Sequence, residues 1–508
     1  MFAVLLILVR CYPALKYRLR SIVGRCNPGV LTLCGLLSLL SACQWGPDYQ
    51  RPETLAQTPG WHHAARAGGA TARRADLPDW WRHYQDPLLN RWVERLNTEN
   101  LGLKAALERI IQAREQVGIE GGARLPGLGL SGDGVRGFAP DLVNNRERAW
   151  RSDISVGANI SWQVDLFGRV RRAVEAAEFQ ALAREQDYLA LRHVLIAELV
   201  SLRARLALLE KEIEIQTRIV ASREQTLNSV NRRYQLGVRN ASAVDVHSAR
   251  ENLSTARATL AGLGLARDET YLGIDRLLNQ APGESRPAGA GFPLLPPMPL
   301  PALVSPAHLL DQRPDIRGNE FRLMAANAGI GVAVADLFPD LTLSANRGFT
   351  GTQAGGLLGN DRALGSIAAR INTRLFEGGR LRANIRLREA QARELSRQYA
   401  DTVLSAMMEV ETALVQEQSL HTQVDSLRAS VISARRAEVL SRERYQRGIT
   451  SLLELLDTQR RWQNAERNLL AAQQASWNAR INLHLALGGD WRLGQVSAPG
   501  LKSPETGK

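Results

Sequence analysis

Cysteine is the most versatile reactive residue type in this chain of 508 residues, and its distribution is uneven. All four cysteines lie within the first 43 residues, at Cys11, Cys26, Cys34 and Cys43. Three of them precede a predicted cleavage point, so the mature chain keeps only Cys43. The mature chain can therefore form no internal disulfide, and it has no cysteine nucleophile or thiolate metal site beyond that position.

The other residue types that commonly perform chemistry do not assemble into a site. The eight histidines are scattered, and the pair His62-His63 lies in a Gly/Ala-rich stretch without partner ligands. No Gly-rich phosphate loop precedes a Lys-Ser/Thr pair, and there is no nucleophile elbow. We therefore expect no catalytic residues, no bound metal and no enzymatic activity.

The net charge of +13 raises the possibility of a nucleic-acid partner, but the position of the charges argues against it. Five Arg and Lys residues, and no acid, lie before residue 43, which leaves +8 for the rest of the chain. In that remainder Arg and Lys alternate with Glu, as in residues 210–212 and 442–444. Such alternation is typical of solvated helix faces, so we expect no nucleic-acid partner.

The N-terminus has the order of a secretory signal. Residues 10–25 are basic, residues 30–37 are largely apolar, and Leu40-Ser41-Ala42 precedes Cys43. This ending resembles the bacterial lipoprotein box, in which signal peptidase II cuts before the cysteine and its thiol receives diacylglycerol. We expect a signal peptide over 1–42 and a covalent lipid on Cys43 as the only non-protein group. The alternative is an ordinary signal with a buried cysteine.

Two segments about 210 residues apart follow the same order of elements. The first contains the anchor segment with short helices, a strand pair and a long helical hairpin, at 43–123, 124–168 and 169–280. The second contains short helices, a strand pair and a long hairpin, at 307–336, 337–378 and 379–488. A Pro-rich linker, 281–306, separates them, and a tail, 489–508, follows. The chain is thus an internal duplication of one structural unit.

The second strand of each pair alternates strictly between apolar and polar residues. In the first copy the apolar face is Ile154, Val156, Ala158, Ile160, Trp162 and Val164. In the second copy it is Ile367, Ala369, Ile371 and Leu375. Strands of this length with one apolar face suit a lipid-facing barrel with a wet lumen. A half-buried soluble sheet would show the same alternation.

A long helix follows each strand pair, from Arg169 to about Leu236 and from Arg380 to about Arg447. Neither stretch contains proline, and apolar residues recur at steps of three and four, which indicates coiled-coil packing. Some 65 residues of helix span on the order of 100 Å. Each helix should end at a glycine, Gly237 or Gly448, because glycine accepts left-handed backbone angles.

This order of elements resembles the TolC-type outer-membrane factors, in their lipoprotein branch. The resemblance covers roughly residues 43–490. The matching motifs are Gly46-Pro47-Asp48-Tyr49, Trp80-Trp81, Asp86-Pro87-Leu88-Leu89, Trp162-Gln163-Val164-Asp165-Leu166-Phe167-Gly168, Arg313-Pro314-Asp315-Ile316 and Leu375-Phe376-Glu377-Gly378-Gly379.

The resemblance implies a mainly α protein with membrane β-strands. Three copies would close a twelve-stranded β-barrel that continues as a periplasmic α-helical coiled-coil barrel. It further implies an outer-membrane exit duct of a tripartite efflux pump, lipid-anchored with a long periplasmic extension. The expected partners are two further copies, a periplasmic adaptor and an inner-membrane transporter of the RND type.

The resemblance also places a periplasmic gate on the returning helix of the second hairpin. Counting from Gly448, Leu453 falls on an apolar constriction, Glu454 and Asp457 fall on acidic rings, and Arg460 could bridge Asp457 to a neighbouring subunit. A spacing of three puts both carboxylates on one helix face, where three copies would attract cations. The alternative is an ordinary helix start, where acids are favoured.

The tips of the two hairpins are the expected adaptor-docking sites. The residues assigned to this role are Tyr234, Gly237 and Val238 in the first tip, and Tyr445, Gly448 and Ile449 in the second. Gly237 to Asp245 spans eight positions, whereas Gly448 to Glu454 spans six, so the first tip carries two extra residues.

Two other classes of protein compete with the duct. A periplasmic coiled-coil adaptor or scaffold lipoprotein would explain the helices and the lipoprotein box, but not two strand pairs with one apolar face. A lipoprotein enzyme would need a catalytic site, and the sequence offers none. The duct is therefore the preferred interpretation, and its cargo is left open.

Overall fold

The computed structural model describes residues 46–53, 60–63, 79–141, 146–238, 242–286, 303, 305–352 and 357–488. The chain forms two compact units. The first comprises residues up to Gln50, Ala113–Gln180 and Arg322–Leu395, and the second comprises the rest. The predicted signal peptide and Cys43 lie outside the described residues, as does most of the Pro-rich linker.

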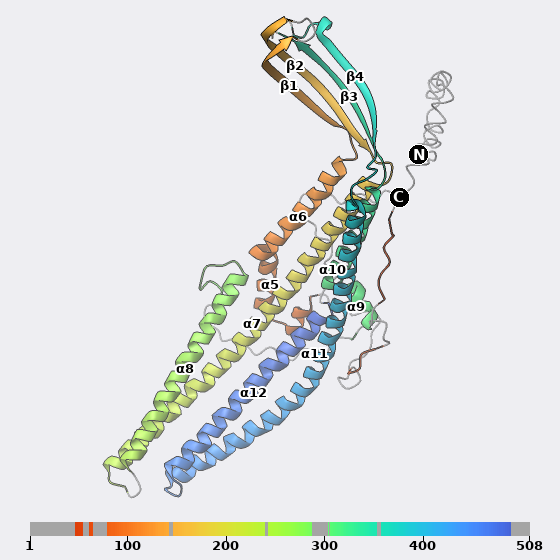
Figure 1. Cartoon of the computed structure of the whole chain (residues 1–508). Helices are drawn as coiled ribbons and strands as arrows, with labels where there is room; N and C mark the ends of the chain where they lie inside the picture. Colours follow the sequence, from red (N-terminus) through yellow and green to blue (C-terminus); the bar gives the residue numbers. More distant parts are fainter. Residues whose placement is uncertain are drawn as a thin grey trace, which may run out of the picture. The chain divides into compact units, whose positions relative to one another are not determined.

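The first unit contains a four-stranded antiparallel sheet with the strand order β1-β2-β3-β4 (Figure 1). Its strands are β1 (Gly127–Asp141), β2 (Arg146–Val164), β3 (Asp340–Gly351) and β4 (Ala363–Asn372). The two strands of the first repeat therefore pair with the two of the second through β2 and β3. Within this chain β1 and β4 are the edge strands.

The register places most apolar residues of the four strands on one face, which also carries Arg347 opposite Ala158. Leu128 pairs with Ile160, Ile160 with Ala345, and Ala345 with Ile367. The adjacent row, which points to the other face, is polar and contains Asn159 opposite Asn346. The apolar face is uncovered in a single chain, and Ile367 is 91% exposed. The alternation predicted from the sequence is therefore present, and it is continuous across the sheet.

The end of β4 differs from the sequence prediction. The strand ends at Asn372, whereas the predicted apolar alternation extended to Leu375. Leu375 and Phe376 follow the strand and are 91% and 88% exposed. Asp340, the first residue of β3, pairs with Asn372, so there is no strand opposite Leu375 for it to pair with.

Each strand pair leads into a helix of 67 residues, α7 (Arg169–Gln235) or α11 (Arg380–Gln446). A glycine with positive φ precedes each start, Gly168 at 79° and Gly379 at 85°. At α7 the carboxylate of Asp165 accepts hydrogen bonds from the amides of Val170 and Arg171, at 3.1 and 2.9 Å. Free helix amides are thereby satisfied where the strand turns into the helix.

The second unit is helical. Its hairpins join α7 to α8 and α11 to α12, and shorter helices α5, α9 and the starts of α6 and α10 pack beside them (Figure 1). The bounds are α5 (Pro87–Glu99), α6 (Leu101–Gly122), α8 (Ala243–Leu277), α9 (Pro306–Gln312), α10 (Pro314–Ala335) and α12 (Leu452–Ala486). Among the described residues, no helix is both long enough and apolar enough to span a membrane.

The largest core of the second unit surrounds the tryptophans that follow residue 79. Trp80, Trp81 and Trp92 pack with Leu89 of α5 and with Leu199 of α7, among others. Beside this core, the buried guanidinium of Arg203 forms an ion pair of 2.7 Å with Asp86. Asp86 also caps α5 by accepting from the amides of Leu88 and Leu89. One carboxylate therefore begins a short helix and fastens it to α7.

Candidate functional site

The two hairpin tips of the second unit begin with the same backbone turn. Gly237 and Gly448 have φ angles of 63° and 72°, which favour glycine. The amide that follows each glycine donates to a carbonyl five residues back, at 3.0 Å in the first tip and 2.9 Å in the second. This is the Schellman pattern of helix ends, so the predicted stops of both long helices are confirmed.

The returning helices also begin alike. Ser242 caps α8, and its capping box with Asp245 is complete. Ser451 caps α12, and its hydroxyl accepts from the amide of Glu454 at 3.3 Å. Both cap residues and both acids are 209 positions apart, whereas the two glycines are 211 apart. The two extra residues of the first tip therefore lie between the glycine and the cap, where residues 239–241 are outside the described part of the chain.

Glu454 thus has a local role in addition to the predicted one. Its carboxylate accepts a hydrogen bond from the hydroxyl of Thr450, and it occupies the same capping position as Asp245. An acid is favoured at this position of any helix. The structure therefore supplies a reason for Glu454 that is independent of a gate.

Arg233 of the first tip contacts the second tip. The guanidinium of Arg233, near the end of α7, lies 5.0 Å from the ring centroid of Tyr445 and donates to the Tyr445 carbonyl at 3.2 Å. Burial raises the pKa of Tyr445, and Arg233 opposes this shift. Tyr234, the equivalent tyrosine of the first tip, is instead 48% exposed. The two predicted docking tyrosines consequently differ in environment.

Apolar side chains are exposed at both tips. The exposed fractions are 38% for Val238, 61% for Ile449 and 72% for Leu236. Large apolar side chains grouped at the end of a structure are typical of an interaction surface. Tyr234, Val238 and Ile449, which were named from the sequence for docking, are therefore accessible, and Leu236 joins them.

The first two turns of α12 have a packed face and an uncovered face. Leu452 and Leu455 are buried in a small core with Val230 of α7 and Val246 of α8. Leu453 points away from that core and is 78% exposed. Asp457, Arg460 and Arg461 follow Leu453 at helical steps of four, seven and eight, so all four share the uncovered face. We call these four residues the entrance face.

Asp457 is held by two arginines of its own helix. Its Oδ1 lies 2.6 Å from Arg460, and its Oδ2 lies 2.7 Å from Arg461. The sequence interpretation assigned Arg460 to a bridge between subunits, and the structure places it on the Asp457 of the same chain. Arg461 was missed, although its step of four from Asp457 was a readable signal.

Among the residues that the structure describes, histidines and carboxylates do not gather into a metal centre. The His63 ring nitrogen Nδ1 lies 2.7 Å from Glu411, which also accepts a hydrogen bond from the His62 amide. One carboxylate beside one imidazole is too few ligands for a typical metal site. The described residues contain no group of three or more His, Cys, Asp or Glu side chains suited to a metal.

In the first unit, the segment that follows Cys43 is fixed to α10 and α7. A Cβ on Gly46 would lie 2.6 Å from the Gly331 Cα, so only glycine allows the two backbones to touch. The side-chain amide of Asn327 donates to the Pro47 carbonyl at 2.8 Å. Arg172, which is almost fully buried, pairs with Asp48 at 3.1 Å. We call residues 46–51 the strap.

The last residue of the strap is anchored in the second unit. Arg51 forms a fork on Glu320, with Nε 2.6 Å from Oε1 and Nη2 2.9 Å from Oε2. The Glu320 side chain is only 2% exposed, and Arg317 also contacts it at 2.8 Å. Bidentate pairs of this kind hold both side chains in one orientation.

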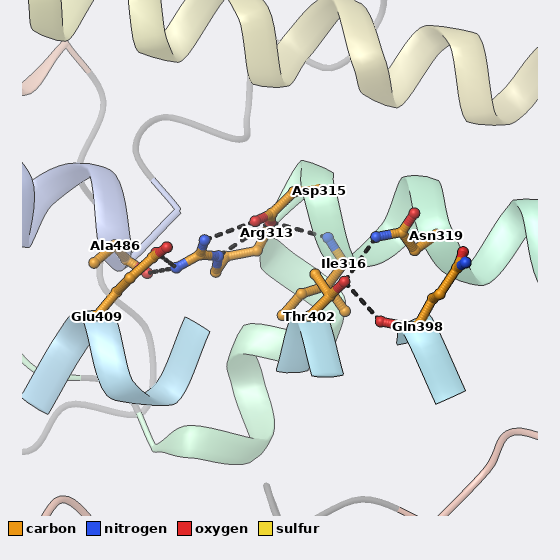
Figure 2. Close-up of polar contacts among 8 residues, drawn as sticks. All are labelled: Arg313, Asp315, Ile316, Asn319, Gln398, Thr402, Glu409 and Ala486. Atoms are coloured by element: carbon orange, nitrogen blue, oxygen red, sulfur yellow. Dashed lines mark hydrogen bonds and ion pairs between the residues drawn. The ribbon is translucent and has the colours of Figure 1, made fainter. Parts of the chain in front are cut away.

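A second arginine, Arg313, links the start of α10 to the end of α12. Figure 2 shows Arg313 at the start of α10, with its guanidinium between Asp315, Glu409 of α11 and the carbonyl of Ala486. The contact with Ala486 is 3.0 Å long and satisfies a carbonyl at the end of α12. The Arg-Pro-Asp motif singled out in the sequence therefore ties three helices together.

A cavity of about 290 Å³ lies in the first unit where the strands meet the helices. Its lining includes Asp165, Arg169, Asp336 and Phe338. Asp165 caps α7, Arg169 pairs with Asp336 at 2.9 Å, and Phe338 stacks on Phe167 with the ring centroids 4.9 Å apart. These side chains contact one another or cap a helix, so we assign the cavity a structural role and not a binding role.

Comparisons with known proteins agree with this architecture. The family model described as outer membrane efflux protein matches residues 92–280 and 306–489. The toluene efflux pump outer membrane protein TtgF of Pseudomonas putida is 30% identical over 464 residues, which is 89% of this chain and 95% of that protein. The outer membrane protein OprJ of Pseudomonas aeruginosa is 30% identical over 461 residues, which is 90% of this chain and 95% of that protein. The solved outer-membrane channel OprN is 29% identical with a TM-score of 0.79, over 88% of this chain and 100% of that one.

Proposed function

Since this chain belongs to the outer membrane efflux protein family, we propose that it is the outer-membrane exit channel of a tripartite efflux pump. The observation that carries the proposal is the sheet of the first unit. Its mainly apolar face extends across four strands with Arg347 as an exception, and nothing in the described part of the chain covers it. A lipid bilayer is the surrounding that such a face requires.

We propose that three copies close the sheet into a twelve-stranded barrel. Among the described residues of one chain, β1 and β4 each leave one edge without a partner strand. Unpaired strand edges are not tolerated in lipid, and closure removes them. Pairing β4 of one copy with β1 of the next would achieve this with four strands from each chain.

The long hairpins would then form the periplasmic part of the channel. Single-chain burial supports this, because Leu387, Leu404 and Met408 along α11 are 54%, 43% and 59% exposed. Large apolar side chains along a helix normally pack against another element. Neighbouring copies would cover them in a coiled-coil barrel.

Transport in this proposal is passive, and the energy comes from partners. The periplasmic adaptor would dock at the hairpin tips, on the exposed side chains of Tyr234, Leu236, Val238 and Ile449. The inner-membrane transporter would be of the RND type, as the resemblance implies. The chain itself would have no enzymatic role and no nucleic-acid partner.

The lipid anchor is also proposed. The lipoprotein box ends at Cys43, and the strap that follows is docked on the protein from Gly46 onward. Incorporation of labelled palmitate into the wild-type chain, and its loss in Cys43→Ser, would test this. Equal labelling of the two chains would contradict it.

Conductance in planar bilayers tests the channel itself. The purified full chain should run as a heat-modifiable trimer from outer-membrane fractions and should conduct ions. A monomer without conductance would favour the competing class, a periplasmic scaffold lipoprotein. Neighbouring genes that encode an adaptor and a transporter would narrow the cargo.

A further inference from the structure

Arg461 changes the electrostatic character of the entrance face. With Arg460 alone, one oxygen of Asp457 would be left for other cations. Arg461 occupies that second oxygen, so both carboxylate oxygens contact guanidinium groups of the same helix. Each oxygen of the carboxylate therefore has a cationic partner within its own chain.

The charges around the entrance face balance. Glu454 and Asp457 contribute two negative charges, and Arg460 and Arg461 contribute two positive charges. The carboxylate of Glu454 is turned to Thr450 at the helix start. The net charge of this part of α12 is therefore zero, where Glu454, Asp457 and Arg460 alone would give a negative ring.

Exposure decides which charge an approaching solute meets. The side chains of Arg460 and Arg461 are 70% and 76% exposed, whereas that of Asp457 is 29% exposed. The guanidinium groups thus lie outside the carboxylate that they contact. A small ion that passes this face encounters cationic groups before it reaches an acid.

Stability does not explain Arg461. An exposed ion pair between residues four apart on a helix contributes little to stability. Asp457 already has Arg460 as a partner. The second arginine is therefore largely redundant for the fold, which leaves its charge as its main effect.

We propose that Arg461 determines the ion selectivity of the channel by neutralising an otherwise acidic entrance, so that the preference for cations is removed. This inference rests on the proposed function, since it requires the entrance face to line the pore of a closed trimer. Rings of charged side chains at a constriction select ions by sign. Three copies of Arg461 would form such a ring.

Reversal potentials across a KCl gradient test the proposal with the full chain in planar bilayers. Arg461→Gln should raise the permeability ratio of K⁺ to Cl⁻ by about threefold, as expected for three unit charges near a narrow aqueous pore. Arg461→Lys keeps the charge and should stay within the wild-type range. Arg257→Gln is the matched control, because this arginine is 60% exposed, belongs to α8 and pairs with Glu224 of α7.

The possible failures are distinguishable. If Arg461→Gln leaves the permeability ratio unchanged while Asp457→Ala alters conductance, the entrance is correctly placed and the role of Arg461 is wrong. If neither variant changes conductance or selectivity, the entrance face does not line the pore, and the gate within the proposed function fails as well. An equal shift in Arg461→Gln and Arg257→Gln would also overturn the proposal.

Discussion

Asn100 and Arg313 occupy corresponding positions in the two repeats, and each donates a hydrogen bond to the end of the returning helix of its repeat. The side-chain amide of Asn100, just before α6, donates to the Leu277 carbonyl at 2.8 Å. The guanidinium of Arg313, just before α10, donates to the Ala486 carbonyl at 3.0 Å. Leu277 and Ala486 are the last residues of α8 and α12. Each repeat is thus fastened where its returning helix ends.

Removal of the Arg313 side chain should destabilise the second unit. Arg313→Ala leaves the Ala486 carbonyl without this donor and removes the contacts with Asp315 and Glu409, which are partly exposed. We expect a loss of about 2 kcal/mol in the free energy of unfolding, and about 1 kcal/mol for Asn100→Ala. Thermal unfolding in detergent, followed by circular dichroism at 222 nm, measures both. Arg467→Ala is the control, and equal melting of Arg313→Ala and this control would contradict the assignment.

Asp457→Ala should loosen the predicted gate. The change releases Arg460 and Arg461 from their shared carboxylate, and three copies would then present unpaired cations that repel one another. We expect a higher single-channel conductance and increased sensitivity of cells to vancomycin. Glu466→Ala on the same helix is the control. Wild-type conductance and sensitivity in Asp457→Ala would remove Asp457 from the gate.

Gly46→Ala should release the strap. Its Cβ would clash with the Gly331 backbone, and the φ of 115° disfavours any other residue. Without this contact the free energy needed to open the strap locally should fall by some 1–3 kcal/mol. We therefore expect protease cleavage near residue 50 to be at least about tenfold faster. Gly329→Ala is the matched control on α10, because nothing lies within 4 Å of the added Cβ. Equal cleavage rates in the two variants would show that the strap does not depend on this contact.

His484 should make stability depend on pH. Its ring is 2% exposed and stacks on Trp80 at 5.1 Å, and neither ring nitrogen has a hydrogen-bond partner in the described structure. Burial, reinforced by Arg480 and His83, lowers the pKa of His484 to about 3. The folded protein therefore keeps the imidazole neutral, whereas the unfolded chain binds a proton below about pH 6.5.

The sign of this effect follows from the proton balance. Between about pH 6.5 and 3 the unfolded state holds more protons, so the free energy of unfolding falls as the pH is lowered. His484→Phe keeps an aromatic ring for stacking and removes the titrating group. Between pH 7 and 4 its free energy of unfolding should therefore fall less than that of the wild type, by on the order of 3 kcal/mol. Denaturant titrations of both chains at several pH values measure the difference. Parallel pH profiles would contradict it.

Periodicity alone predicted much of the fold. The long helices begin at Arg169 and Arg380 as expected, since strand alternation gives way there to steps of three and four. The faces of β2 and β4 also follow from alternation. The end of β4 did not, because Leu375 continues the alternation but has no strand to pair with. Pairing partners are set by tertiary structure, which a local pattern does not record.

The site was predicted only in part. The exposure of Leu453 and the shared face with Asp457 follow from helical spacing. The contact of Arg233 with Tyr445 joins residues 212 positions apart, and the strap on Gly331 joins residues almost 300 apart. Such contacts depend on how helices pack, and no short-range spacing indicates them. Arg461 is the exception, because its spacing from Asp457 was visible.

The two edge strands belong to different repeats, with β1 from the first and β4 from the second. In a closed ring of identical chains, every copy therefore depends on both neighbours. A chain with a blocked β4 edge would spoil any ring that it entered. When intact and defective chains are made in equal amounts, only about one in eight of the three-membered rings would consist entirely of intact copies. Loss-of-function alleles at this edge should consequently behave as genetically dominant.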